Sequence, residues 1–173
     1  GIVRINKIID SLLQFSRNEM LETKNTDVNE VILQIFEIFH PICQKKKIAC
    51  EINQDAASSI VHGNATLLKQ LFLNLIKNAI ESIQHDHGSL KATLSNEDNT
   101  LKVDIVDNGK GIHPSVVGKI FDPFFSSKAH PNIGLGLPLC KEIVEKHRGT
   151  IEVVSSEEDG TIVTVTLPLG ENL

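Results

Sequence analysis

Residues 101–112 read L-K-V-D-I-V-D-N-G-K-G-I, a strand pattern that runs directly into an Asn-Gly turn. The apolar side chains occupy every second position, and Asp107 continues their face of the predicted strand. A carboxylate that points toward a core is costly unless a partner satisfies it. Just beyond it, Gly109 and Gly111 allow close backbone approach or a positive φ. The stretch has two interpretations, an Asp side chain that caps its own turn or one wall of a binding site.

A long amphipathic helix is predicted from about Asn64 to Ile83. Its broad apolar face consists of Leu68, Leu71, Leu75, Ile76, Ala79 and Ile83. A narrow polar stripe on the same helix consists of Gln70, Asn74, Asn78 and Glu81. Amide oxygens on such a stripe can hold a cation, and Mg²⁺ takes few protein ligands because it keeps several waters. The alternative is an ordinary solvated face, although two asparagines one turn apart are unusual in a helix because asparagine is a mediocre helix former.

A phenylalanine-rich segment and two glycines precede the last predicted helix, at about 135–147. Residues 120–128 read I-F-D-P-F-F-S-S-K, and the two serine hydroxyls and Lys128 suit a phosphate group. Gly134 and Gly136 precede or open the helix, where free N–H groups and the helix dipole favour an anion. The alternative is that the three phenylalanines simply hold a loop against the core.

The remaining pattern predicts an α+β fold. The other expected elements are a short amphipathic helix at 2–17, a polar linker at 18–26, a helix from Thr26 or Asp27 to about Cys43, and strands near 47–53, 89–95, 150–155 and 161–167. Helices combined with a mixed, mostly antiparallel sheet indicate a two-layer α/β sandwich.

The composition of the chain further limits the class of protein and the kinds of partner that are expected. The 173 residues are 40% hydrophobic and 23% charged, which is typical of one soluble globular domain. A net charge of −5 provides no basic stripe, so nucleic acid is not expected as a partner. Three scattered cysteines without C-x-x-C spacing favour a reduced, cytoplasmic chain over a disulfide framework or a zinc site. No apolar run approaches the roughly 20 residues that span a bilayer.

Taken together, these motifs resemble the catalytic ATP-binding domain of bacterial sensor histidine kinases, within the wider group of gyrase, heat-shock chaperone and mismatch-repair ATPases. The resemblance covers about residues 27–169. It rests on N-L-I-K-N-A at 74–79 as the asparagine box, D-N-G-K-G-I at 107–112 as the first glycine box, F-D-P-F-F-S-S-K at 121–128 as the phenylalanine box and I-G-L-G-L at 133–137 as the second glycine box. Their order implies a Bergerat-type ATP-binding fold, with ATP and Mg²⁺ as cofactors.

The resemblance also implies a role for each matching residue. Asp107 would accept the exocyclic amino group of adenine, and Asn78 would hold Mg²⁺. Asn74 beside the phosphates and Lys128 at the terminal phosphate would be the catalytic pair, and residues 113–133 would form a mobile lid. The implied nucleotide-binding set is Asn74, Asn78, Asp107, Gly109, Gly111, Ile112, Lys128, Gly134, Leu135, Gly136 and Leu137.

The sequence departs from the family pattern in two places. Asn132 and Ile133 stand where the second glycine box usually carries Gly-Thr or Gly-Ser, although asparagine also tolerates a left-handed turn. Glu81 stands where many members carry a basic residue, so that contact is lost or moves to Lys77 or Lys128.

The family organisation implies three parts and three partners. Residues 1–19 would be the end of a dimerisation hairpin, 20–26 a linker and 27–173 the catalytic domain. The implied partners are the phosphoacceptor hairpin of the same kinase, the receiver domain of a response regulator and a second subunit in a full-length homodimer. None of the seven histidines lies in an H-E-[LI]-[RK]-x-P context, so we expect the phosphoacceptor to lie elsewhere in a longer kinase. The expected location is the cytoplasm, either free or as part of a membrane-anchored sensor.

Two functions remain open at this point. The first is transfer of the ATP γ-phosphate to a histidine. The second is a nucleotide-binding regulatory module, or an ATPase relative without kinase activity. Hydrolytic relatives place a glutamate one helical turn before the metal-binding asparagine, where it acts as a general base. Asn74 occupies that place and cannot take a proton at neutral pH, which favours phosphotransfer.

Overall fold

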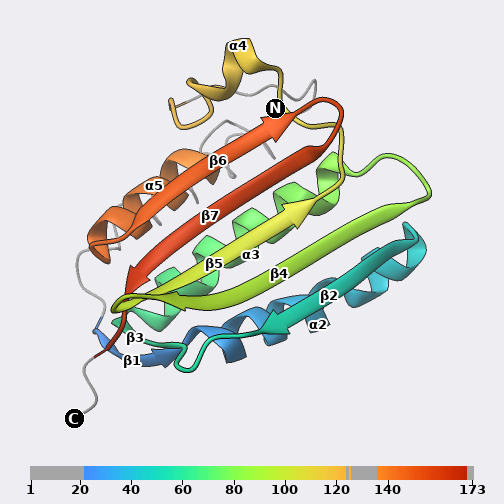
Figure 1. The fold of residues 1–173 in the computed structure, drawn as a ribbon. Coiled ribbons are helices and arrows are strands. Elements are labelled where there is room, and N and C mark those ends of the chain that lie inside the picture. The colour runs from blue at the N-terminus through green and yellow to red at the C-terminus, as the bar shows by residue number, and fades with distance from the viewer. Residues whose placement is uncertain (1–21, 124, 126–135, 171–173) are drawn as a thin grey trace, which may run out of the picture.

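A five-stranded sheet, covered on one face by three helices, organises the chain (Figure 1). The computed structural model describes residues 22–123, 125 and 136–170. Its elements are β1 (Lys24–Asp27), α2 (Val28–Lys45), β2 (Ile48–Gln54), β3 (Ile60–Gly63), α3 (Ala65–Ser82), β4 (Gly88–Glu97), β5 (Thr100–Asp107), α4 (Pro114–Val117), α5 (Gly136–Lys146), β6 (Thr150–Ser156) and β7 (Gly160–Pro168). In Figure 1, α2, α3 and α5 lie behind the sheet, so the predicted two-layer α/β sandwich is confirmed.

The sheet is mixed, as the sequence predicts. Its strand order is β2-β4-β5-β7-β6, with β2 and β4 parallel and every other neighbouring pair antiparallel. The central strand β5 pairs on one side with β4 and on the other with β7, so its end lies in the interior of the sheet. There Asp107 lies opposite Leu90 of β4 and Thr161 of β7.

Side-chain alternation along β5 follows the predicted parity. Leu101, Val103 and Ile105 are at most 1% exposed, and Asp107 shares their face and is 4% exposed. This face of the sheet packs against the helices, because apolar side chains gain free energy when they leave water.

The two long helices begin at residues whose side chains cap them. The Asp27 carboxylate accepts a hydrogen bond from the backbone N–H of Asn29 at the start of α2. The Asn64 side chain accepts from the N–H of Leu67 at the start of α3, which ends before Ile83 as predicted. Each bond satisfies a donor that the first helical turn would otherwise leave without a partner.

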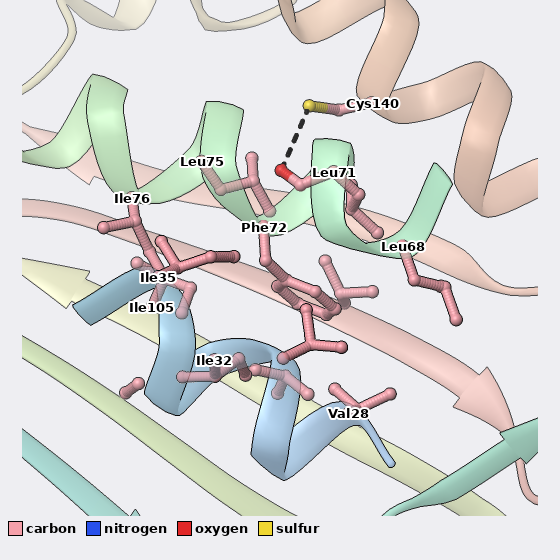
Figure 2. Packing of buried hydrophobic residues seen from close by; sticks show 14 of the residues in the cluster. Val28, Ile32, Ile35, Leu68, Leu71, Phe72, Leu75, Ile76, Ile105 and Cys140 are labelled. Atoms are coloured by element: carbon pink, nitrogen blue, oxygen red, sulfur yellow. Dashed lines mark hydrogen bonds between the residues drawn. The ribbon is translucent and has the colours of Figure 1, made fainter. Parts of the chain in front are cut away.

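The core lies between α2, α3 and the sheet, and α5 extends it (Figure 2). Every residue of the predicted apolar face of α3 is buried. Figure 2 shows Phe72 at the centre, with Ile32 of α2 below it, Ile35 of α2 to its left, and Leu71 and Leu75 on its own helix. The core therefore fixes α3, and with it the polar residues on the opposite side of that helix.

Two short strands were not predicted. The sequence suggests a polar linker up to residue 26, but β1 pairs antiparallel with β3 and closes a small two-stranded sheet. This pairing is made by the backbone, and each strand has only four residues, too few for an alternating pattern to stand out. The described part of the expected linker is therefore partly structured, whereas the helix expected at 2–17 lies outside the described residues.

Three simpler expectations can also be compared with the structure. All three cysteines are free thiols, which agrees with the absence of a disulfide framework. Within the described ranges, no helix combines the length and apolarity needed to cross a membrane. The stretch after β5, which the family resemblance assigns to a mobile lid at 113–133, contains the short helix α4 in its described part.

The core predicts a difference between two matched substitutions. Ile76→Val removes one methylene from a side chain on α3 that is fully buried, and we expect the free energy of unfolding to fall by about 0.5–1.5 kcal/mol. Ile38→Val makes the same change on α2 at a side chain that is 53% exposed, where an effect within about 0.5 kcal/mol is expected. Urea unfolding of both variants measures the difference, and equal losses would contradict the placement of the core.

Candidate active site

Asp107 lies at the end of β5, where it contacts both its own turn and α3. Its Oδ1 atom accepts a hydrogen bond of 2.8 Å from the backbone N–H of Gly109. The same atom accepts one of 2.9 Å from the hydroxyl of Ser82, the last residue of α3. The first bond is the turn cap that the sequence allowed, and the second is not local. The carboxylate is therefore part of a junction between the sheet and α3.

The glycines of the first glycine box are required by close packing. A Cβ atom at Gly109 would overlap Ser82 Oγ. Gly111 has a φ of +66°, and a Cβ atom there would overlap the carbonyl oxygen of Ser156. Immediately after it, the N–H of Ile112 donates to Ser155 Oγ at 2.8 Å. The loop thus runs between the end of α3 and the end of β6, and it has no room for larger residues.

Asn108, the middle residue of the D-N-G turn, has a structural role. Its side-chain oxygen accepts from the N–H of Ser89 at 2.7 Å, and its side-chain nitrogen donates to the carbonyl of His87 at 2.8 Å. These bonds join the end of β5 to the loop before β4. Both polar ends of the Asn108 side chain are therefore used in holding the fold together.

The polar stripe of α3 is only in part a solvated face. Asn74 and Asn78 are half-buried. The side chain of Asn74 hydrogen-bonds to the thiol of Cys140 on α5. That thiol is fully buried and donates to the carbonyl oxygen of Leu71 at 3.8 Å (Figure 2). Burial raises the pKa of Cys140 to about 12, and the bond from Asn74 offsets only part of this rise, so the group remains a neutral thiol at pH 7.

Glu81 and Lys77 form an ion pair with each other on α3. Their charged atoms are 3.8 Å apart, and both side chains are at least one third exposed. An i,i+4 pair of this kind contributes little to stability. It does neutralise the acidic side chain at the position where the family usually carries a basic one. Lys77 is thus engaged with Glu81 in this structure.

The structure describes only part of the second glycine box. Gly136 is the first residue of α5 and is exposed, and Leu137 packs partly buried against the core. The predicted helix at 135–147 is confirmed as Gly136–Lys146. Lys128, Gly134 and Leu135 lie outside the described residues, as does most of the expected lid after Pro123.

Two residues beside Asp107 were missed by the sequence reasoning. Thr161 of β7 lies directly opposite Asp107, is 8% exposed, and shares a hydrogen bond of 2.7 Å with Ser155. Ser82 provides the hydroxyl described above. The Gly160-Thr161 pair marks the start of a predicted strand and could have drawn attention to Thr161. The register that brings Thr161 opposite Asp107 cannot be predicted from one sequence.

The loop geometry predicts opposite effects of two glycine substitutions. Gly111→Ala should lower the free energy of unfolding by about 1–2 kcal/mol through its left-handed backbone alone, and further through overlap with Ser156. Gly118→Ala is the control, because Gly118 has a φ of −67° and nothing within 4 Å of an added Cβ. There we expect no loss, or a gain of up to about 1 kcal/mol. Urea unfolding distinguishes the two, and a tolerated Gly111→Ala would contradict this loop conformation.

The chain is similar in sequence to a known protein family and to several of its members. The family described as histidine kinase-, DNA gyrase B- and HSP90-like ATPase matches residues 63–171. Sporulation kinase B of Bacillus subtilis is 31% identical over 165 residues, which cover 95% of this chain and 38% of that protein. The sensor histidine kinase ZraS of Klebsiella oxytoca is 32% identical over 166 residues, covering 96% and 36%. The chain therefore spans less than two fifths of the length of these relatives.

Solved structures agree with the family match. The nucleotide-free catalytic domain of the histidine kinase ThkA superposes with a TM-score of 0.77 at 30% identity, covering 86% of this chain and 96% of that one. ThkA in complex with the response regulator TrrA gives a TM-score of 0.81 at 28% identity, covering 98% of this chain and 48% of that one. The chain belongs to the family of histidine kinase-, DNA gyrase B- and HSP90-like ATPases, and within it to the catalytic domains of sensor histidine kinases.

Proposed function

We propose that this domain binds Mg²⁺-ATP between the end of β5 and the polar stripe of α3, and transfers the γ-phosphoryl group to a histidine on a dimerisation hairpin. One observation supports the proposal above all others. A buried carboxylate, Asp107, is held at the end of the central strand directly beside the helix that carries Asn74 and Asn78. The two ends of a nucleotide need these two kinds of group, an acceptor for the base and amides for the phosphates and metal.

At the base end, Asp107 would accept a hydrogen bond from the exocyclic amino group of adenine. A carboxylate has no proton to donate at neutral pH, so it suits an amino group and not a keto oxygen. Its burial keeps water from competing for the same bond, which strengthens the interaction. Gly109 and Gly111 would let the backbone pass close to the nucleotide, and Ile112 would line the same wall.

At the phosphate end, the amide groups of α3 fit a hard cation. Asn78 would provide one oxygen to Mg²⁺, which accepts few protein ligands and leaves other positions to water and phosphate. When bound, the ion neutralises charge that develops on the transferred phosphoryl group. Asn74 would lie beside the phosphates, next to the thiol of Cys140. The start of α5 at Gly136 would face the phosphates, with Gly134, Leu135, Leu137 and Lys128 as further contacts.

Phosphotransfer is favoured over hydrolysis by the chemistry of Asn74. An amide cannot take a proton from water at neutral pH, so Asn74 cannot act as the general base that hydrolytic relatives carry at this position. In the proposed reaction the lone pair of a neutral imidazole nitrogen forms a bond to the γ-phosphorus, and the bond from that phosphorus to the ADP oxygen breaks, its electrons leaving with ADP; the proton on the other ring nitrogen can then be lost to solvent. Asn74 and Lys128 would orient and stabilise the phosphoryl group during this step.

The partners belong to the same proposal. Residues 1–19 would end a dimerisation hairpin that carries the phosphoacceptor, with residues 27–173 as the catalytic domain. The relatives are named sensor histidine kinases, and one similar structure is a kinase in complex with a response regulator. We therefore infer a receiver domain as the downstream partner, a homodimer in the full-length protein and a cytoplasmic location for this domain.

The adenine contact predicts a large loss of affinity in one variant. Asp107→Asn places an amide donor opposite the adenine amino group, and the loss of a charged hydrogen bond costs about 1.5–3 kcal/mol, or roughly 10- to 150-fold in affinity. Asp104→Asn is the matched control, because Asp104 lies on the opposite face of β5 and its Oδ1 accepts from Thr164. Calorimetric titration with Mg²⁺-ATP measures both variants. Unchanged affinity in Asp107→Asn would reject the contact.

The absence of a phosphoacceptor motif predicts where radiolabel appears. Incubated alone with γ-labelled Mg²⁺-ATP, the chain should remain unlabelled and should release phosphate far below ~1 s⁻¹. When its dimerisation hairpin is added as a separate polypeptide, that polypeptide should acquire acid-labile phosphate. Asn78→Ala should abolish the transfer, whereas Lys69→Ala, at an exposed position of the same helix, should not.

Two outcomes would contradict this assignment. Acid-labile label on one of the seven histidines of the chain itself would mean that the acceptor has been misidentified. Steady hydrolysis at ~1 s⁻¹ or above would favour an ATPase.

A further inference from the structure

We propose that Ser82 is a positioning residue that determines how strictly the site selects an adenine base. Its hydroxyl would hold the carboxylate of Asp107 in the one orientation that accepts an exocyclic amino group. This inference rests on the proposed adenine contact of Asp107, and it assigns a role to a residue outside the motifs of the family resemblance.

The hydrogen bond of Ser82 to Asp107 joins two distant parts of the sequence. Ser82 Oγ lies 2.9 Å from Asp107 Oδ1 and 2.8 Å from the carbonyl oxygen of Ala79. A serine hydroxyl has one proton, so it donates to one of these acceptors at a time. An ionised carboxylate is the stronger acceptor, and this one is almost completely buried. The hydroxyl therefore favours Asp107 over the helix carbonyl.

The loop after β5 contacts Ser82 in two further ways. The backbone N–H of Lys110 donates to the carbonyl oxygen of Ser82 at 3.1 Å. Gly109 lies so close that any side chain there would overlap the Ser82 hydroxyl. The last carbonyls of α3 are also held from the other side, since Lys46 Nζ donates to Ile80 at 2.7 Å. At Ser82, the end of α3 and the loop after β5 are thus held against each other.

This junction also sets the spacing between the two ends of the nucleotide. Asn78 precedes Ser82 by four residues and Asn74 precedes it by eight, which is about 6 Å and about 12 Å of helix rise. Because Asp107 is bonded directly to Ser82, the base acceptor keeps a fixed distance from the amides assigned to the metal and the phosphates. A shift at Ser82 would change that distance.

The consequence for specificity follows from the two bonds at Oδ1. The N–H of Gly109 and the hydroxyl of Ser82 both donate to this atom, so they stabilise the ionised carboxylate and restrict its rotation. An ionised carboxylate held in this orientation should bind a base that has an exocyclic amino group more tightly than a base that lacks one. Without the hydroxyl, the carboxylate loses one of the groups that orient it, and the preference for a base with an exocyclic amino group should decrease.

The test compares two nucleotides whose bases differ by the exocyclic amino group. The affinities of Mg²⁺-ATP and of Mg²⁺-purine riboside triphosphate are measured by calorimetry for the parent chain and for Ser82→Ala. We expect the preference for ATP to fall roughly 3- to 10-fold, through weaker ATP binding and nearly unchanged binding of the analogue. Ser82→Thr keeps a hydroxyl and should retain most of the preference. Ser95→Ala on β4 is the control for a serine outside the site and should leave the preference unchanged.

Asp107→Asn separates failure of this inference from failure of the proposed function. If the preference for ATP is lost in Asp107→Asn but unchanged in Ser82→Ala, the adenine contact stands and the role of Ser82 is overturned. If both nucleotides bind equally more weakly to Ser82→Ala, the residue only supports the fold and the inference is again overturned. If Asp107→Asn leaves the preference unchanged, the adenine contact itself is wrong.

Discussion

A buried carboxylate at the end of the central strand is the constraint on which the site depends. Asp107 lies on the apolar face of β5, where an unsatisfied charge would cost several kcal/mol. The structure satisfies it with the N–H of its own turn and with a hydroxyl from α3. These bonds require the loop to approach the helix closely, which explains why Gly109 cannot be larger. The same bonds orient the carboxylate and offset the cost of burying it.

Helix α3 connects this constraint to the rest of the molecule. One face of the helix is completely buried against α2 and the sheet, with Phe72 at the centre of the core. Its polar stripe contacts α5 through Asn74 and Cys140, and its last residue contacts the loop after β5. Asn74 and Asn78, assigned to the phosphates and the metal, therefore lie on this helix, and Asp107, assigned to the base, is bonded to its last residue. Packing of the core is in this way part of the preorganisation of the site.

Several features were predictable from the sequence because they depend on local patterns. The apolar period predicted both ends of α3 to within a residue, and alternation along β5 placed Asp107 on the inner face. The neighbours of that carboxylate were not predictable. Ser82, which donates a hydrogen bond to it, is 25 residues away in the sequence, and Thr161 lies opposite it only because of the register in which β7 pairs with β5. Strands β1 and β3 were missed for a related reason, since four-residue strands held by backbone pairing leave little trace in side-chain patterns.

In the proposed site, the end of β5 and the polar stripe of α3 would bind the two ends of one nucleotide. A crystal structure of this chain with Mg²⁺ and a non-hydrolysable ATP analogue would test this arrangement. We expect the adenine amino group at about 3 Å from the Asp107 carboxylate, with Mg²⁺ bound to the side-chain oxygen of Asn78. A nucleotide whose base lies away from Asp107, or whose metal is held without Asn78, would contradict it.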